Sequence, residues 1–211
     1  MRLGLLADIH EEVEHLRRAV DLLHACGVSK FVVLGDVFDT GKRLDATVAV
    51  LSQLDAVGVW GNHDFGLCRD VTEAVRRRYP QAVVEYFGRL EPWLEVGPCR
   101  FQHIEPFLDS ERLEDLWAYG GEGVLSPAQS FAACPHRRVF MGHVHRWELF
   151  TPSGPVAWPD REPVRLQGGQ RYLVVTHAVQ QGWCAWYDLE RDELCRLHVD
   201  GPDAASDRGR G

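Results

Sequence analysis

The chain has 211 residues, 45% of them hydrophobic, and a formal net charge of −8 at neutral pH. This length and composition fit one domain with a substantial core, and no apolar run is long enough to cross a membrane. The acidic charge argues against a stable nucleic-acid partner, which needs an excess of Lys and Arg. A cytoplasmic location is expected, because the first residues lack the apolar stretch of a secretion signal and the cysteines suggest no disulfide framework.

The first sixty residues alternate between short apolar runs and helical patterns. The runs at residues 3–7, 30–34 and 56–60 are typical of buried strands. Apolar side chains recur at helical spacing over residues 13–23, and a second helix is expected at residues 44–54. This strand–helix order predicts right-handed crossovers and a parallel sheet.

The rest of the chain is expected to add a few helices and a second group of strands. Helices are expected at residues 71–78, 111–118 and 127–133. Short segments are expected at residues 83–86, 93–96 and 99–102, and strands at residues 138–141, 147–150, 171–176, 183–189 and 193–198. Turn residues between the last three strands suggest hairpins.

The expected elements fit a single domain over residues 1–200. Two sheets packed face to face, with helices outside, would bury the apolar sides of these strands and helices. Residues 151–170 are rich in Pro and Gly and are expected to form a long loop. Residues 201–211 are small and polar, and a disordered tail is expected there.

Five groups of side chains that can bind metal follow predicted strands. They are Asp8 with His10, Asp36 with Asp39, Asn62 with His63, His103 alone, and His143 with His145. In open α/β sheets, ligands bind beyond the carboxyl ends of the strands. The five groups are therefore expected to converge on one site.

Each group by itself also has an ordinary structural explanation. Asp8 can stabilise the N-terminus of the helix that follows it, and Asp36 and Asn62 lie in segments that suit solvated turns. A lone histidine such as His103 is more often held by a backbone partner than by a metal. For the pair that begins at His143, a metal site and two surface histidines are equally good explanations.

Together the groups supply seven metal ligands, which are Asp8, His10, Asp36, Asn62, His103, His143 and His145. Seven ligands exceed what one tetrahedral ion needs. They suit two ions about 3.5–4 Å apart, as in two-metal phosphoester hydrolysis. Oxygen and nitrogen ligands without cysteine suit divalent Mn, Fe, Co, Ni or Zn better than a soft metal. Mn is the first expectation, and Mg is a further alternative.

The order of the motifs, D-x-H, G-D-x-x-D, G-N-H-D, a lone H and G-H-x-H, resembles the calcineurin-like metallophosphoesterase superfamily, in particular its small bacterial phosphodiesterases. The resemblance runs from Asp8 to His145, and residues 171–189 are similar to the closing strands of the family. It implies an α/β fold, a four-layer α-β-β-α sandwich of two mixed sheets flanked by helices. It also implies an enzyme, a dimetal-dependent phosphoester hydrolase.

The resemblance also implies a role for each motif residue. One metal ion would be held by Asp8, His10, Asp36 and His145, and the other by Asp36, Asn62, His103 and His143, with Asp36 bridging. Asn62 and His63 would contact the substrate, and His63, oriented by Asp39, would protonate the leaving oxygen. A hydroxide between the two ions would attack phosphorus in line.

Two positions depart from the family pattern. Relatives that act on phosphoproteins or dinucleoside tetraphosphates usually have an arginine in the second motif that clamps a phosphate, where this chain has Thr40. The missing clamp favours phosphodiesters over monoesters and phosphoproteins, unless Lys42 or Arg43 replaces it. Late in the chain, where related phosphodiesterases usually have a Gly-Ser turn, His177 either faces the substrate or packs within its loop.

Three other functions remain open. A non-catalytic scaffold on the same fold, as in the small subunit of retromer, has no need of His63, which is present here with Asp39 and all seven ligands. A protein or nucleotide phosphomonoesterase would need another phosphate clamp. A DNA-repair nuclease of this superfamily has extra capping segments after the core. The acidic charge of this chain also argues against DNA as a substrate. A small phosphoester is the expected partner, and the oligomeric state is open.

Overall fold

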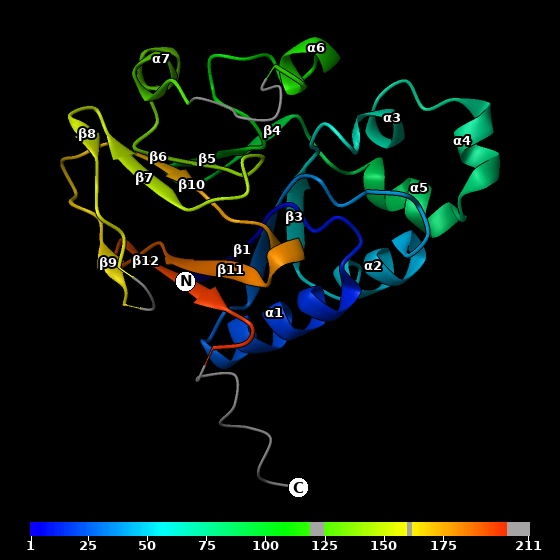
Figure 1. Ribbon diagram of the computed structural model, residues 1–211, viewed down its shortest axis with the longest axis horizontal. Coiled ribbons are helices and arrows are strands. Elements are labelled where there is room, and N and C mark those ends of the chain that lie inside the picture. The colour runs from blue at the N-terminus through cyan, green and yellow to red at the C-terminus, as the bar shows by residue number, and fades with distance from the viewer. Residues whose placement is uncertain (119–124, 160–161, 202–211) are drawn as a thin grey trace, which may run out of the picture.

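The computed structural model describes residues 1–118, 125–159 and 162–201. Two six-stranded sheets pack face to face, and helices lie on their outer sides (Figure 1). The layers follow the order α-β-β-α, which confirms the predicted fold class. Apart from Gly201, the predicted tail lies outside the described residues.

The first sheet has the strand order β3-β2-β1-β11-β12-β9. Its strands are β1 (Arg2–Leu6), β2 (Lys30–Leu34), β3 (Ala56–Val59), β9 (Val164–Arg165), β11 (Trp183–Asp188) and β12 (Glu193–His198). Strands β1, β2 and β3 are parallel, as the strand–helix order of this part of the sequence predicted.

The second sheet has the strand order β4-β5-β6-β10-β7-β8. Its strands are β4 (Trp93–Val96), β5 (Cys99–Gln102), β6 (Arg138–Met141), β7 (Glu148–Thr151), β8 (Gly154–Pro155) and β10 (Tyr172–Val175). Strands β5, β6 and β10 are parallel. The carboxyl ends of all three therefore lie at one end of this sheet.

The described helices lie mainly between the strands of the first half of the chain. They are α1 (Val13–Ala25), α2 (Leu44–Leu51), α3 (Phe65–Cys68), α4 (Glu73–Arg78), α5 (Gln81–Phe87), α6 (Leu113–Leu116), α7 (Pro127–Ala133) and the 3-10 helix η1 (Val179–Gln181). None of these described helices is both long enough and apolar enough to cross a bilayer.

Two segments differ from the sequence-based expectation. The apolar segment at residues 83–86 lies within helix α5, because Val83, Tyr86 and Phe87 share one face at helical spacing and are buried in the core. The predicted loop at residues 151–170 contains strands β8 and β9. Strand β9 pairs Val164 with Leu194 of β12, a contact between distant residues that local composition does not reveal.

The core follows from the alternation of side chains along the strands. In β1, Leu3 and Leu5 face the apolar cluster between the two sheets, whereas Leu6 faces the cluster beneath α1, which includes Leu16. A third cluster joins α7, through Phe131, to the outer face of the second sheet. Each fully buried Leu or Phe contributes about 1.5–3 kcal/mol to folding, so these layers hold the strand ends in fixed positions.

A buried ion pair ties β6 to the turn before β12. The side chain of Arg138 is 2% exposed and pairs with the Asp192 carboxylate. The Arg138 Nε donates to Asp192 Oδ1 at 2.8 Å, and the Tyr187 hydroxyl donates to the same oxygen at 2.6 Å. Burial opposes ionisation of Asp192, but the hydrogen bonds from Arg138 and Tyr187 hold its pKa below the usual value.

Asp192→Ala is expected to lower the free energy of unfolding by about 2–4 kcal/mol, because removing one partner leaves Arg138 charged and buried without its carboxylate. The expected loss of stability is smaller than for a fully buried pair, because the Asp192 side chain is 26% exposed. Urea unfolding measures the change. The matched control is Asp55→Ala, which removes an exposed pair with Lys30 and should cost less than about 1 kcal/mol. Equal losses in the two variants would contradict this account.

Candidate metal centre

The loops after five strands, three in the first sheet and two in the second, meet at one place. Asp8 and His10 follow β1, Asp36 follows β2, Asn62 follows β3, His103 follows β5, and His143 and His145 follow β6. Backbone hydrogen bonds join neighbouring loops, from the Asp8 N–H to the Gly35 carbonyl at 3.1 Å and from the His10 N–H to the Asp36 carbonyl at 2.9 Å. The convergence expected from the order of the motifs is thus present in the fold.

The first group of facing atoms comes from the β1 and β6 loops. The Nε2 atoms of His10 and His145 are 3.3 Å apart, and His145 Nε2 is 3.2 Å from Asp8 Oδ1. The backbone N–H of His143 donates to both oxygens of Asp8, at 3.1 and 3.0 Å. Asp8 is fully buried, so its carboxylate is held in a fixed orientation towards the two imidazoles.

The second group lies deeper in the protein. His103 Nε2 is 3.2 Å from His143 Nδ1 and 3.4 Å from Asp36 Oδ2. The Asn62 Oδ1 atom is 3.0 Å from each of these two ring nitrogens. Four side chains from four different loops therefore direct oxygen and nitrogen atoms towards one another.

Asp36 belongs to both groups, because its Oδ2 atom is also 3.7 Å from His10 Nε2. Ring nitrogens that face each other at these distances attract only when a proton or a cation lies between them. Mixed oxygen and nitrogen ligands with a shared carboxylate fit a pair of divalent cations. The seven predicted ligands are thus brought together in an arrangement that suits two ions.

The protonation of His103 follows from its surroundings. Its Nδ1 is 2.7 Å from the Leu34 carbonyl and donates to it, which leaves Nε2 aimed at the cluster. Burial lowers the pKa of His103, but the Asp36 carboxylate outweighs this effect and raises the pKa to about 9. Burial and the neighbouring His103 lower the pKa of His143 to about 4. The cluster therefore favours one positive charge beside Asp36, a place that a cation can take.

Two glycines of the motifs are required by close approach. A Cβ atom on Gly61 would overlap the Asp36 carboxylate, and one on Gly142 would lie 2.8 Å from Asp8 Oδ2. Only glycine leaves room for these carboxylates. The glycines of G-N-H-D and G-H-x-H are thus explained by the packing of the site.

The backbone at the site is strained. Among the described residues, left-handed φ angles of non-glycine residues occur at Asp8, His10, Glu11, Asp36, Asp70, His143, His145 and Asp192. Six of these eight lie in or next to the predicted metal-binding motifs. Such conformations cost on the order of 1–3 kcal/mol each and persist where the surroundings enforce them, commonly at functional sites.

His63 is half-buried and lies beside the cluster. Its backbone N–H donates to Asp36 Oδ1 at 2.9 Å, and its ring is 4.7 Å from the ring of His10. A ring nitrogen of His63 also lies within 4.8 Å of ligand atoms of His10 and Asp36. His63 is therefore within reach of a cation as well as of a substrate.

Asp39 does not contact His63 in the part of the chain that the structure describes. Its side chain is exposed, and its backbone N–H donates to Glu11 Oε1 at 3.0 Å. The role of Asp39 in orienting His63 therefore stays a prediction, without a contact that supports it.

His177 follows β10, beside the strand end that carries Asp8. The Ala178 N–H donates to His177 Nδ1 at 2.8 Å, so the ring proton of the neutral imidazole is on Nε2. Its ring is stacked on Trp183 at 5.5 Å and lies 6.1 Å from the ring of Trp147. Burial and the nearby His145 lower the pKa of His177 to about 4. His177 thus packs within its loop and still keeps one hydrogen-bond donor beside the cluster.

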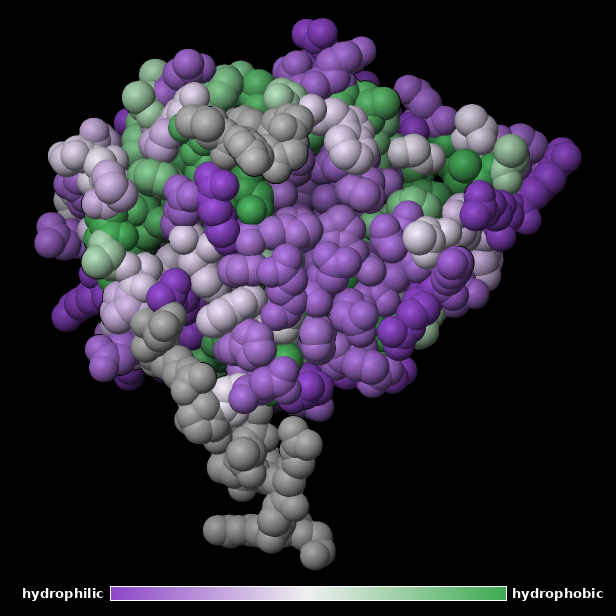
Figure 2. Space-filling view, in the orientation of Figure 1, coloured by the Kyte–Doolittle hydropathy of each residue, from purple (hydrophilic) through white to green (hydrophobic). Residues whose placement is uncertain are grey.

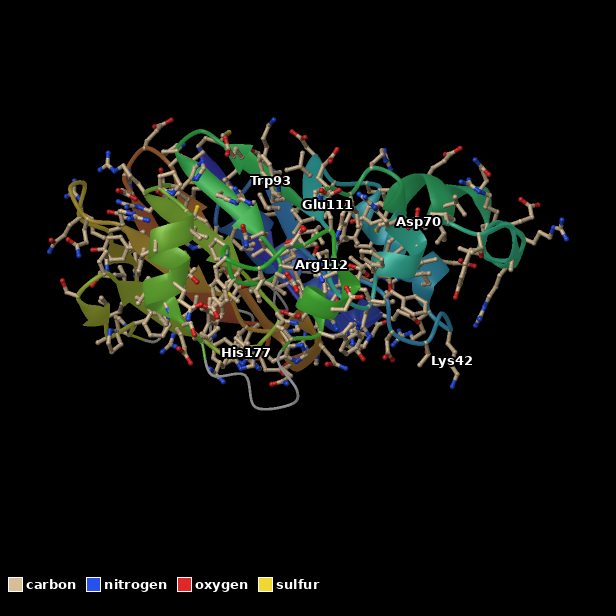
Figure 3. All side chains as sticks on the ribbon, turned by 90° about the horizontal axis from the view of Figure 1, so that it is seen from above. Lys42, Asp70, Trp93, Glu111, Arg112 and His177 are labelled. Carbon is tan, nitrogen blue, oxygen red and sulfur yellow. The ribbon has the colours of Figure 1, made fainter. Side chains whose placement is uncertain are left out.

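The region around η1, next to His177, lies near the middle of Figure 1, and the surface there is mainly hydrophilic (Figure 2). Lys42 lies at the periphery, far from His177 (Figure 3). Arg43 is turned towards α1, 3.5 Å from Glu12 and 3.2 Å from Glu14. Neither basic residue takes the place of the missing arginine clamp in this structure.

Sequence analysis missed Glu11, which shapes the loop after β2. Its buried carboxylate accepts backbone N–H groups of Asp39 at 3.0 Å, Gly41 at 2.5 Å and Arg43 at 2.8 Å. A carboxylate with three backbone donors fixes the loop firmly. The signal in the sequence was its position directly after His10.

Asp64 was also missed, although it ends the G-N-H-D motif. It is fully buried, and it accepts the N–H of Phe38 at 2.9 Å and that of Gly61 at 3.0 Å. Burial, and then the charge of Asp36, raise the pKa of Asp64 to about 7. Asp64 therefore joins the loops after β2 and β3, which carry Asp36 and Asn62.

Trp117 is a third residue that sequence analysis did not single out. Its ring lies 5.3 Å from that of His63, tilted by 45°, and the residue is 52% exposed. It lies 54 positions after His63, so no local pattern in the sequence connects the two.

Comparisons with known proteins concern the family and the fold of the chain. The family described as the calcineurin-like phosphoesterase superfamily domain matches residues 1–158. A metallophosphoesterase from Sphaerobacter thermophilus is 20% identical, with a TM-score of 0.74 over 95% of this chain and 88% of that one. A structure described as a novel archaeal phosphodiesterase is 11% identical, with a TM-score of 0.54 over 94% of this chain and 99% of that one. At these identities the structures support the fold.

Sequence comparison also finds the uncharacterized protein MJ0912 of Methanocaldococcus jannaschii. The two are 29% identical over 65 residues, which make up 31% of this chain. The match spans about 27% of the length of that relative, so it carries no conclusion about the activity of the whole protein.

Proposed function

The chain belongs to the calcineurin-like phosphoesterase superfamily, and from this premise we propose that it hydrolyses small phosphodiesters with two divalent metal ions. The observation that carries the proposal is the convergence of seven oxygen and nitrogen ligands from five strand ends, with Asp36 shared between two groups. When bound, the ions supply Lewis-acid polarisation and a nucleophile from water.

The proposed ligands divide as the two groups of facing atoms do. Asp8, His10, Asp36 and His145 would hold one ion, and Asp36, Asn62, His103 and His143 the other. Mn is the metal we propose first, because the donors are borderline nitrogen and hard oxygen atoms without cysteine. Fe, Co, Ni, Zn or Mg would be compatible with the same ligands.

In this proposal His63 is the general acid. Its half-buried ring lies beside the cluster, where it can donate a proton to the oxygen that leaves phosphorus. Its backbone N–H donates a hydrogen bond to Asp36 Oδ1 at 2.9 Å, which fixes the backbone of His63 relative to the metal site. Proton transfer of this kind typically contributes about 10²–10⁴-fold to the rate.

Asn62 and His177 are the proposed substrate contacts beside His63. The Nε2–H of His177 is the free donor of its ring, because Nδ1 accepts the Ala178 N–H. It can donate to a phosphoryl oxygen or to the group that stays on phosphorus. The packing of His177 against Trp183 supports this role by holding the ring in place before substrate arrives.

We propose a preference for diesters because an arginine clamp is lacking. A monoester carries nearly two negative charges and rewards an arginine fork beside the metals. Thr40 stands at the position where relatives place that arginine, and Arg43 interacts with Glu12 and Glu14 instead. A diester carries one charge and needs less neutralisation.

The expected result is a higher kcat/KM for bis-p-nitrophenyl phosphate than for p-nitrophenyl phosphate, by about tenfold. That ratio is the effect of about 1.4 kcal/mol of differential stabilisation. Both rates are measured with Mn²⁺ at one pH, and Thr40→Arg is the matched variant that should raise the monoester rate. A clear preference of the wild type for the monoester would overturn the diester assignment and leave the phosphoesterase proposal intact.

The other expectations about partners are also proposals. The net charge of −8 argues against a stable nucleic-acid complex. It is compatible with a small phosphoester as partner, because bound metal cations can dominate the local field. A cytoplasmic location stays a prediction. The rival function, a non-catalytic scaffold, is tested by the same assay, since a scaffold would hydrolyse neither ester.

A further inference from the structure

Trp117 lies over the residue that is proposed to protonate the leaving group. Its ring is 5.3 Å from that of His63, and the residue is 52% exposed. An exposed tryptophan leaves apolar surface in water, and ligand sites are lined mainly by hydrophobic and aromatic side chains. Because Trp117 lies beside His63, the surface that it forms is on the side of the site where the leaving group is proposed to depart.

The segment that carries Trp117 is anchored to the strand end that carries His63. The indole Nε1 of Trp60, which directly follows β3, donates to the Ser110 carbonyl at 2.8 Å. Leu116, next to Trp117, is fully buried, and the Trp117 N–H donates to the Leu113 carbonyl at 3.1 Å. Trp117 and His63 are therefore held in a fixed relation, with their rings in contact and much of the Trp117 ring left exposed beside His63.

We propose that Trp117 is a specificity residue that stacks on a planar aromatic leaving group of the substrate, such as a nucleoside base or a phenol. The inference rests on the proposed function, because it needs His63 beside the leaving oxygen. In hydrolysis the bond between phosphorus and this oxygen breaks, and the oxygen takes the proton. The group bonded to the oxygen then extends past His63 to the Trp117 ring.

The geometry favours a planar partner over an aliphatic one. Aromatic pairs attract each other beyond the burial of their area, and a base stacks favourably on an aromatic side chain. An aliphatic group gains only the burial of its area. Trp117 is thus expected to raise kcat/KM for aromatic leaving groups by about tenfold over aliphatic ones, the effect of about 1.4 kcal/mol of stacking.

The test compares two methyl phosphodiesters whose leaving alcohols have similar acidity, methyl phenyl phosphate and methyl hexafluoroisopropyl phosphate. Both are assayed with Mn²⁺-loaded protein, as wild type, Trp117→Ala and Trp117→Phe. The matched control is Trp93→Ala, which removes another exposed tryptophan. Trp93 lies on β4, is 44% exposed, and has the Arg100 guanidinium over its ring. Figure 3 shows Trp93 on a different part of the molecule from His177.

In the wild type we expect the phenyl ester to be preferred. Trp117→Ala should lower kcat/KM for that ester about tenfold and change the fluorinated ester less than twofold, and Trp117→Phe should restore most of the loss. Trp93→Ala should change neither. If Trp117→Ala lowers kcat/KM equally for both esters, Trp117 only supports His63. The specificity proposal is then overturned, while the proposed function stands.

A binding measurement separates this inference from turnover. The nitroaromatic probe 4-nitrophenylphosphonate, which has no P–O bond to a leaving group, should quench tryptophan fluorescence in wild type and in Trp93→Phe. The quenching should be smaller in Trp117→Phe. If the wild type hydrolyses neither ester, the proposed function fails, and equal quenching in all three proteins overturns the Trp117 site independently.

Discussion

Asp36→Asn is expected to remove turnover to the level of the metal-free protein, a loss of about 10³-fold or more. Asp36 is 2% exposed, and its Oδ2 atom faces both His103 Nε2 and His10 Nε2, at 3.4 and 3.7 Å. An amide presents one oxygen and no charge, so it cannot serve two cations. Lewis-acid stabilisation of the reaction is worth several kcal/mol, and each 1.4 kcal/mol is about tenfold in rate.

The measurement is kcat/KM together with metal content by elemental analysis. Wild type should hold two divalent ions per chain, Asp36→Asn should hold fewer, and a chelator should bring the wild type to the rate of the variant. Asp45→Asn, an exposed carboxylate in the first turn of α2, is the matched control and should keep both ions. Two ions retained by Asp36→Asn would show that Asp36 does not bridge them.

His63→Ala is expected to lower kcat/KM about 10²–10⁴-fold for a diester with a poor leaving group, through loss of general acid assistance. The deficit should shrink for p-nitrophenol, because a stable leaving anion needs less protonation. The fold and most of the bound metal should be kept, since the His63 side chain is assigned to the proton. Its backbone hydrogen bond to Asp36 survives the substitution.

The metal content of the variant distinguishes two roles of His63, that of proton donor and that of metal ligand. Its ring nitrogen lies close enough to His10 and Asp36 to reach a cation, and a His63 that binds metal would give a variant with fewer ions. His24→Ala, which removes an exposed histidine of α1, is the control for a general effect of losing an imidazole. Wild-type turnover of a poor-leaving-group ester by His63→Ala would show that the acid lies elsewhere.

The family, the fold class and the candidate ligands could be predicted from the sequence, because their signals are local. Apolar runs and helical spacing mark the strands and helices. A motif such as Asp8-x-His10 places two ligands within three residues, and the parallel order of β1, β2 and β3 brings the ends of those strands to one edge. The order of five such motifs was sufficient to identify the family, which the comparison over residues 1–158 confirms.

Other features were decided by tertiary structure, because they depend on contacts between distant residues. Strand β9 forms through its pairing with β12. The ring proton of His177 is on Nε2 because Nδ1 accepts the Ala178 N–H. Asp39 matches a family motif, yet its carboxylate is exposed, while the neighbouring backbone bonds to Glu11. Local sequence gives the residue types of a loop, but the docking of that loop on its neighbours sets where each side chain points.

Trp117 shows this difference most directly. The sequence around it predicts a helix at residues 111–118, and nothing near it resembles a catalytic motif. The hydrogen bond from Trp60 to Ser110 and the burial of Leu116 bring its ring to His63. The candidate metal ligands could be predicted from the sequence because each lies just after a predicted strand, whereas packing between distant segments determined what surrounds the proposed leaving group.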